Sequence, residues 1–272
     1  MTFRNFFPGS VILFFLAGIL SACNAPIPIL DPRPDIELTW SKAKVAFPPF
    51  RSGREVLFAN LEDGSVENRL EGLPRNTQLP VVLYVHGCTG IGSDGFFRAL
   101  ARAGYVVIAP DSMARRYRPL QCDPETRTGG YNRFVYDFRL TEISFALDRL
   151  KQLPWVDQNR LYLIGVSEGG VAVALYRGDE FRARVIAQWT CMGAPLVQGI
   201  FAPRDEPVLS IVRDRDPWYD ANRTRNQKGD CGTFMAGRAN SRSIVLKGGD
   251  HDILGDAENV GTILKFLEVS GR

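Results

Sequence analysis

The feature that most constrains the fold is a repeated alternation of short apolar runs with segments of helical periodicity. Near-continuous apolar runs are typical of strands buried on both faces. Such runs occupy residues 79–85, 105–109, 161–164, 185–189, 208–212 and 244–247. Helical spacing is found at residues 95–103, 138–153, 168–176 and 257–269. This alternation predicts an α/β fold with a mostly parallel central sheet and helices on both faces. Further antiparallel edge strands are expected at residues 45–47, 55–59 and 65–70.

The N-terminal segment has the pattern of an export signal. Arg4 precedes an apolar stretch at residues 11–20, which is shorter than the ~20 residues that a membrane-spanning helix needs. The stretch ends in LSAC, residues 20–23, which resembles the lipobox of bacterial lipoproteins. The resemblance implies that the signal is removed and that Cys23 becomes a diacylated N-terminal residue. The alternative is an uncleaved N-terminal helix.

These observations predict three parts. Residues 1–22 are expected to be a lipoprotein signal peptide, residues 23–40 a Pro-rich tether, and residues 41–272 the folded domain. The protein is then expected in the bacterial cell envelope, held by its lipid at the outer membrane or the periplasmic face. A formal net charge of +3 with interspersed signs gives no reason to expect a nucleic-acid partner.

A short glycine-flanked motif, GVSEG at residues 165–169, lies between a predicted strand and a predicted helix. This is G-x-S-x-G in the strand–turn–helix context of a nucleophile elbow. Side chains at the two glycine positions would collide with the neighbouring strand and helix. The helix N-terminus favours the negative charge that develops when Ser167 attacks. The pattern by itself is common, and its position makes Ser167 the candidate nucleophile.

A second glycine-rich segment, HGCTG at residues 86–90, directly follows the strand predicted at 79–85. In hydrolases of this architecture that loop supplies one backbone N–H to the oxyanion hole, and the residue after the nucleophile supplies the other. The donors here would be the amides of Cys88 and Glu168. The alternative is a plain turn.

Histidine is scarce in this chain, which contains only His86 and His251. His86 belongs to the loop just described, where a structural role is expected. His251 follows the last predicted strand and is therefore the only histidine left to serve as the general base. A lone histidine is otherwise more often a satisfied surface or core residue.

Two aspartates, Asp214 and Asp216, follow the strand predicted at 208–212. The order Ser167, Asp216, His251 is that of α/β-hydrolases. We favour Asp216 over Asp214 because several loop residues are needed to bring a carboxylate to the imidazole. Asp250 and Asp252 adjoin the histidine and are expected to be solvated or to cap turns.

These motifs together resemble the dienelactone hydrolase family of the α/β-hydrolase superfamily. The similarity spans roughly residues 79–267 and rests on LYVHGCTGI, APDS, LIGVSEGG, DPW and GDHDIL. One departure concerns the nucleophile, because dienelactone hydrolases proper carry a cysteine where this chain has Ser167. The resemblance therefore implies the α/β-hydrolase fold and a carboxylic-ester hydrolase without a cofactor, and it leaves lactone specificity open.

Four cysteines remain after Cys23, and an even number in an exported protein favours disulfides. Cys88 and Cys122 lie in loops after adjacent predicted strands, and Cys191 and Cys231 lie in analogous loops after the next ones. We predict the pairs Cys88–Cys122 and Cys191–Cys231, with other connectivities or reduced buried cysteines as alternatives. No Cys-x-x-Cys or paired His spacing is present, so no metal is expected.

The loop at residues 111–131 carries several arginines close to the expected substrate edge of the sheet. They are Arg115, Arg116, Arg118 and Arg127. A solvated loop is the favoured interpretation, and recognition of a substrate carboxylate is the alternative.

The favoured functional prediction is a serine esterase that acts on a small-molecule ester through an acyl-enzyme. One alternative is a peptidase of the prolyl-oligopeptidase type, although no propeller domain precedes the core. A second alternative is a non-catalytic envelope lipoprotein that retains the fold, although no triad member is missing.

Overall fold

The computed structural model describes residues 31–50, 55–92, 94–118, 122–123, 126, 128–129, 133–193, 198–219 and 229–271. The chain divides into two units, Met1–Arg33 and Pro34–Arg272, and the elements below belong to the second. The expected signal peptide and Cys23 lie outside the described residues. No helix in the described part of the chain is long and apolar enough to cross a membrane.

An eight-stranded sheet forms the centre of the described domain, in the order β10-β9-β8-β7-β3-β4-β1-β2. The strands are β1 (Lys44–Phe47), β2 (Leu57–Asn60), β3 (Leu79–Val85), β4 (Val106–Ala109), β7 (Val156–Val166), β8 (Ala183–Ala187), β9 (Val208–Arg213) and β10 (Arg242–Leu246). The strands from β10 to β4 are parallel, and β1 and β2 continue the sheet antiparallel. The mostly parallel sheet expected from the sequence is therefore confirmed. A separate hairpin joins β5 (Cys122–Asp123) to β6 (Thr128–Gly129).

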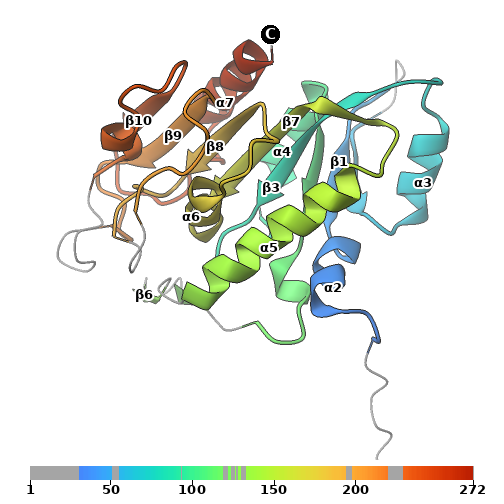
Figure 1. Ribbon diagram of the computed structural model, residues 1–272, viewed down its shortest axis with the longest axis horizontal. Coiled ribbons are helices and arrows are strands. Elements are labelled where there is room, and N and C mark those ends of the chain that lie inside the picture. The colour runs from blue at the N-terminus through green and yellow to red at the C-terminus, as the bar shows by residue number, and fades with distance from the viewer. Residues whose placement is uncertain are drawn as a thin grey trace, which may run out of the picture. The chain divides into compact units, whose positions relative to one another are not determined.

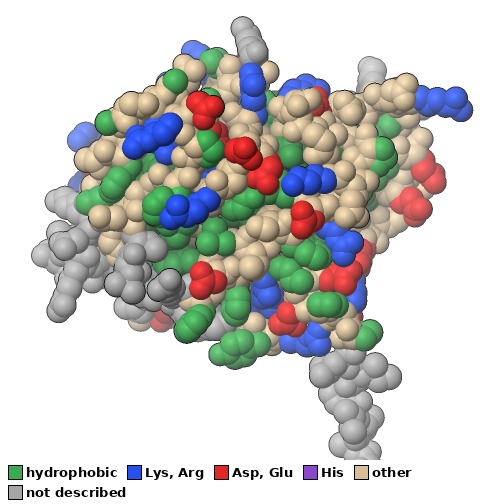
Figure 2. Space-filling view, viewed as in Figure 1, with side chains coloured by type: hydrophobic (Ala, Val, Ile, Leu, Met, Phe, Trp, Pro, Cys, Tyr) green, Lys and Arg blue, Asp and Glu red, His purple; other side chains and the backbone are tan. Residues whose placement is uncertain are grey.

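Helices cover both faces of the sheet (Figure 1). Helices α5 (Arg133–Leu150) and α6 (Glu168–Leu175) pack on one face, and α4 (Asp94–Arg102) and α7 (Ala257–Ser270) pack on the other. Alternate residues of β3 enter the two cores: Leu83 and Val85 face α5 and α6, whereas Val82 and Tyr84 face α4 and α7. On the face drawn in Figure 2, basic and acidic side chains are interspersed.

Two of the three expected edge strands are confirmed as β1 and β2, and the third is wrong. Residues 65–70 lie in helix α3 (Gly64–Glu71). The Asp63 side chain caps this helix by accepting a hydrogen bond from the Ser65 amide. Val66 is its one buried residue, and Leu70 packs partly buried against the same core. The two lie about one helical turn apart, and the polar Asn68 between them gives no two-residue alternation that would stabilise a strand.

The folded domain also begins earlier than expected. Helix α2 (Asp35–Ser41) occupies the end of the segment predicted as a tether through residue 40. Its first turn carries Asp35 and Glu37, which favour a helix N-terminus. Leu38 and Thr39 are buried, and the Thr39 carbonyl accepts a hydrogen bond from the Asp111 amide at 2.8 Å. Packing against the domain therefore makes this segment a helix.

Candidate active site

The carboxyl ends of the parallel strands bring the predicted site residues to one edge of the sheet (Figure 1). His86 directly follows β3, and Ser167 directly follows β7. Asp216 and His251 come from the loops after β9 and β10. Because neighbouring parallel strands end at the same edge, residues far apart in sequence meet there.

Ser167 occupies a tight turn between β7 and α6, with φ 53° and ψ −118°. Such a positive φ is unfavourable for a residue with a side chain, so the surrounding contacts must hold it. A Cβ on Gly165 would collide with the Gly169 carbonyl, and a Cβ on Gly169 would collide with the Val85 carbonyl. The two glycines of the motif are therefore required by close backbone approach, as the sequence predicts.

Asp216 and His251 form a short hydrogen bond, with 2.6 Å between His251 Nδ1 and Asp216 Oδ2. Asp216 is 2% exposed, and its second oxygen accepts a hydrogen bond from the Trp218 amide at 3.0 Å. The carboxylate therefore holds the ring with Nδ1 as the donor, which leaves Nε2 as an acceptor. His251 Nε2 is buried and has no hydrogen-bond partner within the described residues.

Asp214 is engaged elsewhere. It accepts hydrogen bonds from Lys247 Nζ and from the Gly248 amide, each at 3.0 Å. The Lys247 ammonium, and then the Gly248 amide, lower the pKa of the Asp214 carboxyl. The geometry therefore brings Asp216, and not Asp214, to the histidine.

The two aspartates beside the histidine act within their own loop. Asp250 Oδ1 accepts a hydrogen bond from the Asp252 amide at 3.1 Å. Asp252 Oδ1 accepts one from the Leu254 amide at 3.0 Å. Both side chains are exposed. They cap turns, as the sequence predicts.

A cavity of about 420 Å³ contains both Ser167 and His251. Its lining includes Cys88 from the loop after β3 and Trp218 from the loop after β9. The Trp218 ring lies 5.6 Å from the His251 ring between centroids, at an interplanar angle of 45°. The candidate nucleophile, the candidate base and one candidate oxyanion donor therefore face the same space.

Gln188 is a site residue that the sequence argument missed. Its side-chain amide donates to the His251 carbonyl at 2.6 Å, and its own carbonyl accepts from the Tyr219 hydroxyl at 2.5 Å. Gln188 has a positive φ of 59° and lines the cavity. Its position directly after β8, at the same edge as Ser167, is the signal that could have identified it.

His86 is fully buried and neutral. Nε2 accepts a hydrogen bond from the Ser112 amide at 3.0 Å, so Nδ1 carries the proton that it donates to the Gly87 carbonyl at 2.7 Å. Burial, and then the nearby Arg139 guanidinium, hold the pKa of His86 well below its usual 6.5. The structural role expected for this histidine is consistent with these contacts.

Both predicted disulfides are present. Cys88 pairs with Cys122, with 5.9 Å between their Cα atoms. Cys191 pairs with Cys231, with 4.9 Å between their Cα atoms. The first bridge connects the loop that follows β3 to the short hairpin β5–β6.

The expectation that the arginine loop is solvated is wrong for two of its members. The side chains of Arg115 and Arg118 are only 8% and 4% exposed. Arg115 donates to Glu142 at 2.8 Å, and Arg118 donates to Glu168 at 2.6 Å. They are buried because they neutralise buried carboxylates. Arg116 pairs with Asp35 nearer the surface, and Arg127 lies outside the described residues.

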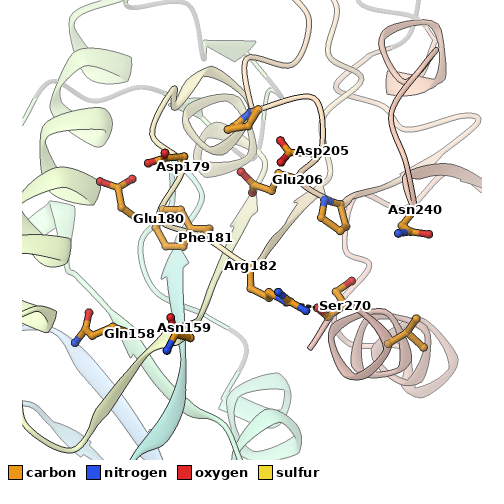
Figure 3. Close-up of a pocket in the computed structure, with 13 residues that line it drawn as sticks. Gln158, Asn159, Asp179, Glu180, Phe181, Arg182, Asp205, Glu206, Asn240 and Ser270 are labelled. Carbon is orange, nitrogen blue, oxygen red and sulfur yellow. Dashed lines mark hydrogen bonds between the residues drawn. The ribbon is translucent and has the colours of Figure 1, made fainter. Parts of the chain in front are cut away.

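A larger cavity, of about 680 Å³, lies at the opposite edge of the sheet (Figure 3). Its lining residues lie near the start of β7, precede β8, β9 and β10, or end α7. Arg182 Nε donates there to the Ser270 carbonyl at 2.6 Å. The lining includes the carboxylates of Asp179, Glu180, Asp205 and Glu206. This cavity is separate from the one that contains Ser167.

Several solved structures resemble the chain at low sequence identity. A Klebsiella pneumoniae protein assigned as a dienelactone hydrolase is 20% identical, with a TM-score of 0.51, over 72% of this chain and 89% of that chain. A protein from Bacteroides ovatus assigned as a dipeptidyl aminopeptidase IV is 14% identical, with a TM-score of 0.50, over 73% of this chain and 32% of that chain. A hyperthermophilic esterase from the archaeon Pyrobaculum calidifontis is 16% identical, with a TM-score of 0.47, over 86% of this chain and 88% of that chain.

Sequence comparison with protein families is more specific. No curated protein matches the chain. The dienelactone hydrolase family matches residues 69–228, which include the glycine-rich loop, Ser167 and Asp216. This match extends over more than half of the 272 residues. The chain therefore belongs to the dienelactone hydrolase family.

Proposed function

We propose that the protein is a serine hydrolase of carboxylic esters that works through an acyl-enzyme. The observation that carries the proposal is the 2.6 Å bond between His251 Nδ1 and Asp216 Oδ2, with Ser167 on the same cavity. Membership of a hydrolase family supports it. The nucleophile is Ser167, the general base is His251, and Asp216 orients the imidazole.

The proposed reaction proceeds in two halves. Ser167 Oγ attacks the ester carbonyl carbon while His251 Nε2 takes its proton, and the backbone amides of Cys88 and Glu168 bind the oxyanion. The carbon–oxygen bond to the leaving group breaks, and His251 passes the proton to the departing alcohol. Water then attacks the acyl group, His251 takes a proton from it, and Ser167 leaves with that proton as the acid is released.

Peptide hydrolysis is the main alternative, because the same fold and the same order of residues serve peptidases. The Bacteroides ovatus protein shares the fold, but this chain covers only 32% of it. The family match extends over more than half of this chain. We therefore favour an ester substrate.

The test combines an active-site label with a substrate panel. We expect a fluorophosphonate probe to label wild-type protein at Ser167, and p-nitrophenyl esters of graded acyl length to be cleaved faster than peptide p-nitroanilides. Ser144→Ala is the matched control, because Ser144 lies exposed on α5 and its loss should leave labelling intact. Faster cleavage of the amides would favour the peptidase. The absence of both labelling and cleavage would favour a non-catalytic binding protein.

We also propose that Cys23 is lipidated and holds the protein in the bacterial cell envelope. The support is the LSAC sequence after a short apolar stretch. Cys23→Ser is expected to leave an unprocessed precursor or a soluble form, because the acylated side chain is lost. Intact-mass spectrometry of membrane-extracted protein measures this directly. A mature wild-type chain without added acyl mass would refute the anchor.

The disulfide at Cys88 gives a further prediction. Cys122→Ala should lower both thermal stability and ester turnover, because the bridge restrains the loop that carries a proposed oxyanion donor. Cys231→Ala, the matched control, should lower stability alone, since neither partner of its bridge is such a donor. Each bridge is expected to contribute roughly 3–4 kcal/mol through loop entropy. Thermal melting and turnover of both variants test this difference between the two bridges. Free thiols at Cys88 and Cys122 in envelope-purified protein would contradict the proposed role of their bridge.

A further inference from the structure

A buried cluster of charged side chains lies at the proposed oxyanion donors, and the mechanism above does not use these side chains. The cluster contains Arg118, Arg139, Glu142 and Glu168, whose side chains are 4%, 1%, 3% and 2% exposed. We call these four residues the Arg139 cluster. None of them is among the described residues that line the cavity of Ser167. We therefore expect the four side chains to act through other groups and not by touching a substrate themselves.

Arg139, on α5, contacts both segments that carry the proposed donors. Its Nη2 donates to the His86 carbonyl at 2.6 Å, and its Nη1 lies 3.2 Å from His86 Nε2. Its Nε lies 3.8 Å from Glu168 Oε1. His86 lies two residues before Cys88, and Glu168 follows Ser167. One guanidinium therefore connects the loop after β3 to the first residue of α6.

Arg118 closes the cluster into a ring. Its Nη2 donates to Glu168 Oε1 at 2.6 Å, and its Nε donates to Ser112 Oγ at 2.9 Å. The Ser112 hydroxyl donates to Glu142 at 2.8 Å, and Glu142 in turn accepts from Arg139 at 2.9 Å. Each charged group is thus held from more than one side, which restricts where Glu168 can lie.

The energetics point to a role beyond stability. A buried ion pair often contributes little net stability, because desolvation offsets the attraction, whereas loss of one partner leaves an unpaired buried charge. Burial raises the pKa of Glu168, and Arg139 and Arg118 oppose that rise. If one of the two arginines is removed, we expect the Glu168 carboxyl to take up a proton or to move. Movement of this residue displaces its own backbone amide.

We propose that Arg139 and Arg118 are positioning residues that hold the backbone amides of Cys88 and Glu168 in place for the oxyanion. The inference rests on the proposed acyl-enzyme mechanism. Preorganised donors are effective only when they are already aimed at the developing charge. A buried ring of charge-assisted hydrogen bonds, closed by the ion pair between Arg139 and Glu168, provides that rigidity.

The test is a mutant cycle of Arg118→Met, Glu168→Gln and the double variant, measured by steady-state ester hydrolysis. Removal of an oxyanion donor lowers kcat by about 10²–10³-fold, so displacement of one should lower kcat by about 10-fold in each single variant, with KM nearly unchanged. The double variant should lose little more than either single one, because both changes break the same contact. Arg118→Lys should recover most of the kcat, since an ammonium can still pair with Glu168.

Glu206→Gln supplies the matched control. Glu206 forms a buried pair elsewhere in the domain, with 2.5 Å between Glu206 Oε2 and Arg184 Nη2, at the edge of the sheet opposite Ser167. This variant should lower the melting temperature and leave kcat within about 2-fold of wild type, because no proposed donor depends on it.

The outcomes separate the two proposals. Folded Arg118→Met or Glu168→Gln with wild-type kcat, or a loss of kcat as large in Glu206→Gln, would overturn the positioning role while Ser167-dependent turnover persists. Wild-type turnover that does not depend on Ser167 would overturn the proposed function and this inference with it. Circular dichroism and thermal melting establish that each variant is folded.

Discussion

Replacement of Ser167 or His251 by alanine is expected to lower ester turnover by about 10⁴-fold or more. Ser167→Ala removes the atom that forms the acyl-enzyme, and His251→Ala removes the base that takes its proton. The double variant should lose little more than either single variant, because the two residues act as a unit.

The measurement is kcat/KM for a p-nitrophenyl ester, with thermal melting to establish folding. Ser144→Ala should retain wild-type turnover, since this exposed serine on α5 bonds the Leu140 carbonyl and the Tyr176 side chain, neither of which lines the Ser167 cavity. Wild-type-like turnover in either Ser167→Ala or His251→Ala would contradict the assignment. Additive losses in the double variant would show that the two residues do not act together.

Asp216→Asn is expected to lower turnover by about 10⁴-fold while the protein stays folded. The amide has nearly the same shape as the carboxylate, but it no longer favours the Nδ1–H form of His251 and cannot stabilise an imidazolium. The bond at stake is the 2.6 Å contact between His251 Nδ1 and Asp216 Oδ2. The measurement is kcat and its pH dependence, determined separately from KM. A loss in kcat reports the catalytic step, whereas a loss of substrate binding would appear in KM.

Asp214→Asn is the matched control for that change. It removes a charge from the same loop, but Asp214 bonds Lys247 and Gly248. We expect turnover to stay within about 3-fold of wild type, with little loss of stability because the ion pair with Lys247 is exposed to solvent. If Asp214→Asn were the more damaging of the two, the triad acid would have to be reassigned.

The elements that could be predicted are those whose evidence lies within a few residues. The apolar residues of β3 follow one another without alternation, so the composition of the segment alone predicts a strand that is buried on both faces. The apolar pattern of residues 65–70 predicts a strand where helix α3 forms. The Asp63 side chain that caps this helix lies outside that pattern. The N-terminal helix α2 was missed because its burial depends on a distant loop, through Asp111.

The candidate site divides in the same way. The glycines around Ser167 could be assigned from sequence, because the collisions that exclude side chains involve the turn and the adjacent strand. The two-histidine composition made His251 the only candidate base. The arginine loop could not be interpreted, because a run of arginines looks the same whether it is solvated or buried against carboxylates.

The sequence by itself determined most of the strand and helix pattern, the family and the candidate nucleophile and base, because local periodicity and residue type carry that information. Only the tertiary structure decided which carboxylate reaches His251 and which acids neutralise Arg118 and Arg139. Asp216 and His251 are separated by 35 residues, and Arg118 and Glu168 by 50. Contacts over such separations depend on how strands stack side by side in the sheet, and spacing along the chain does not encode them.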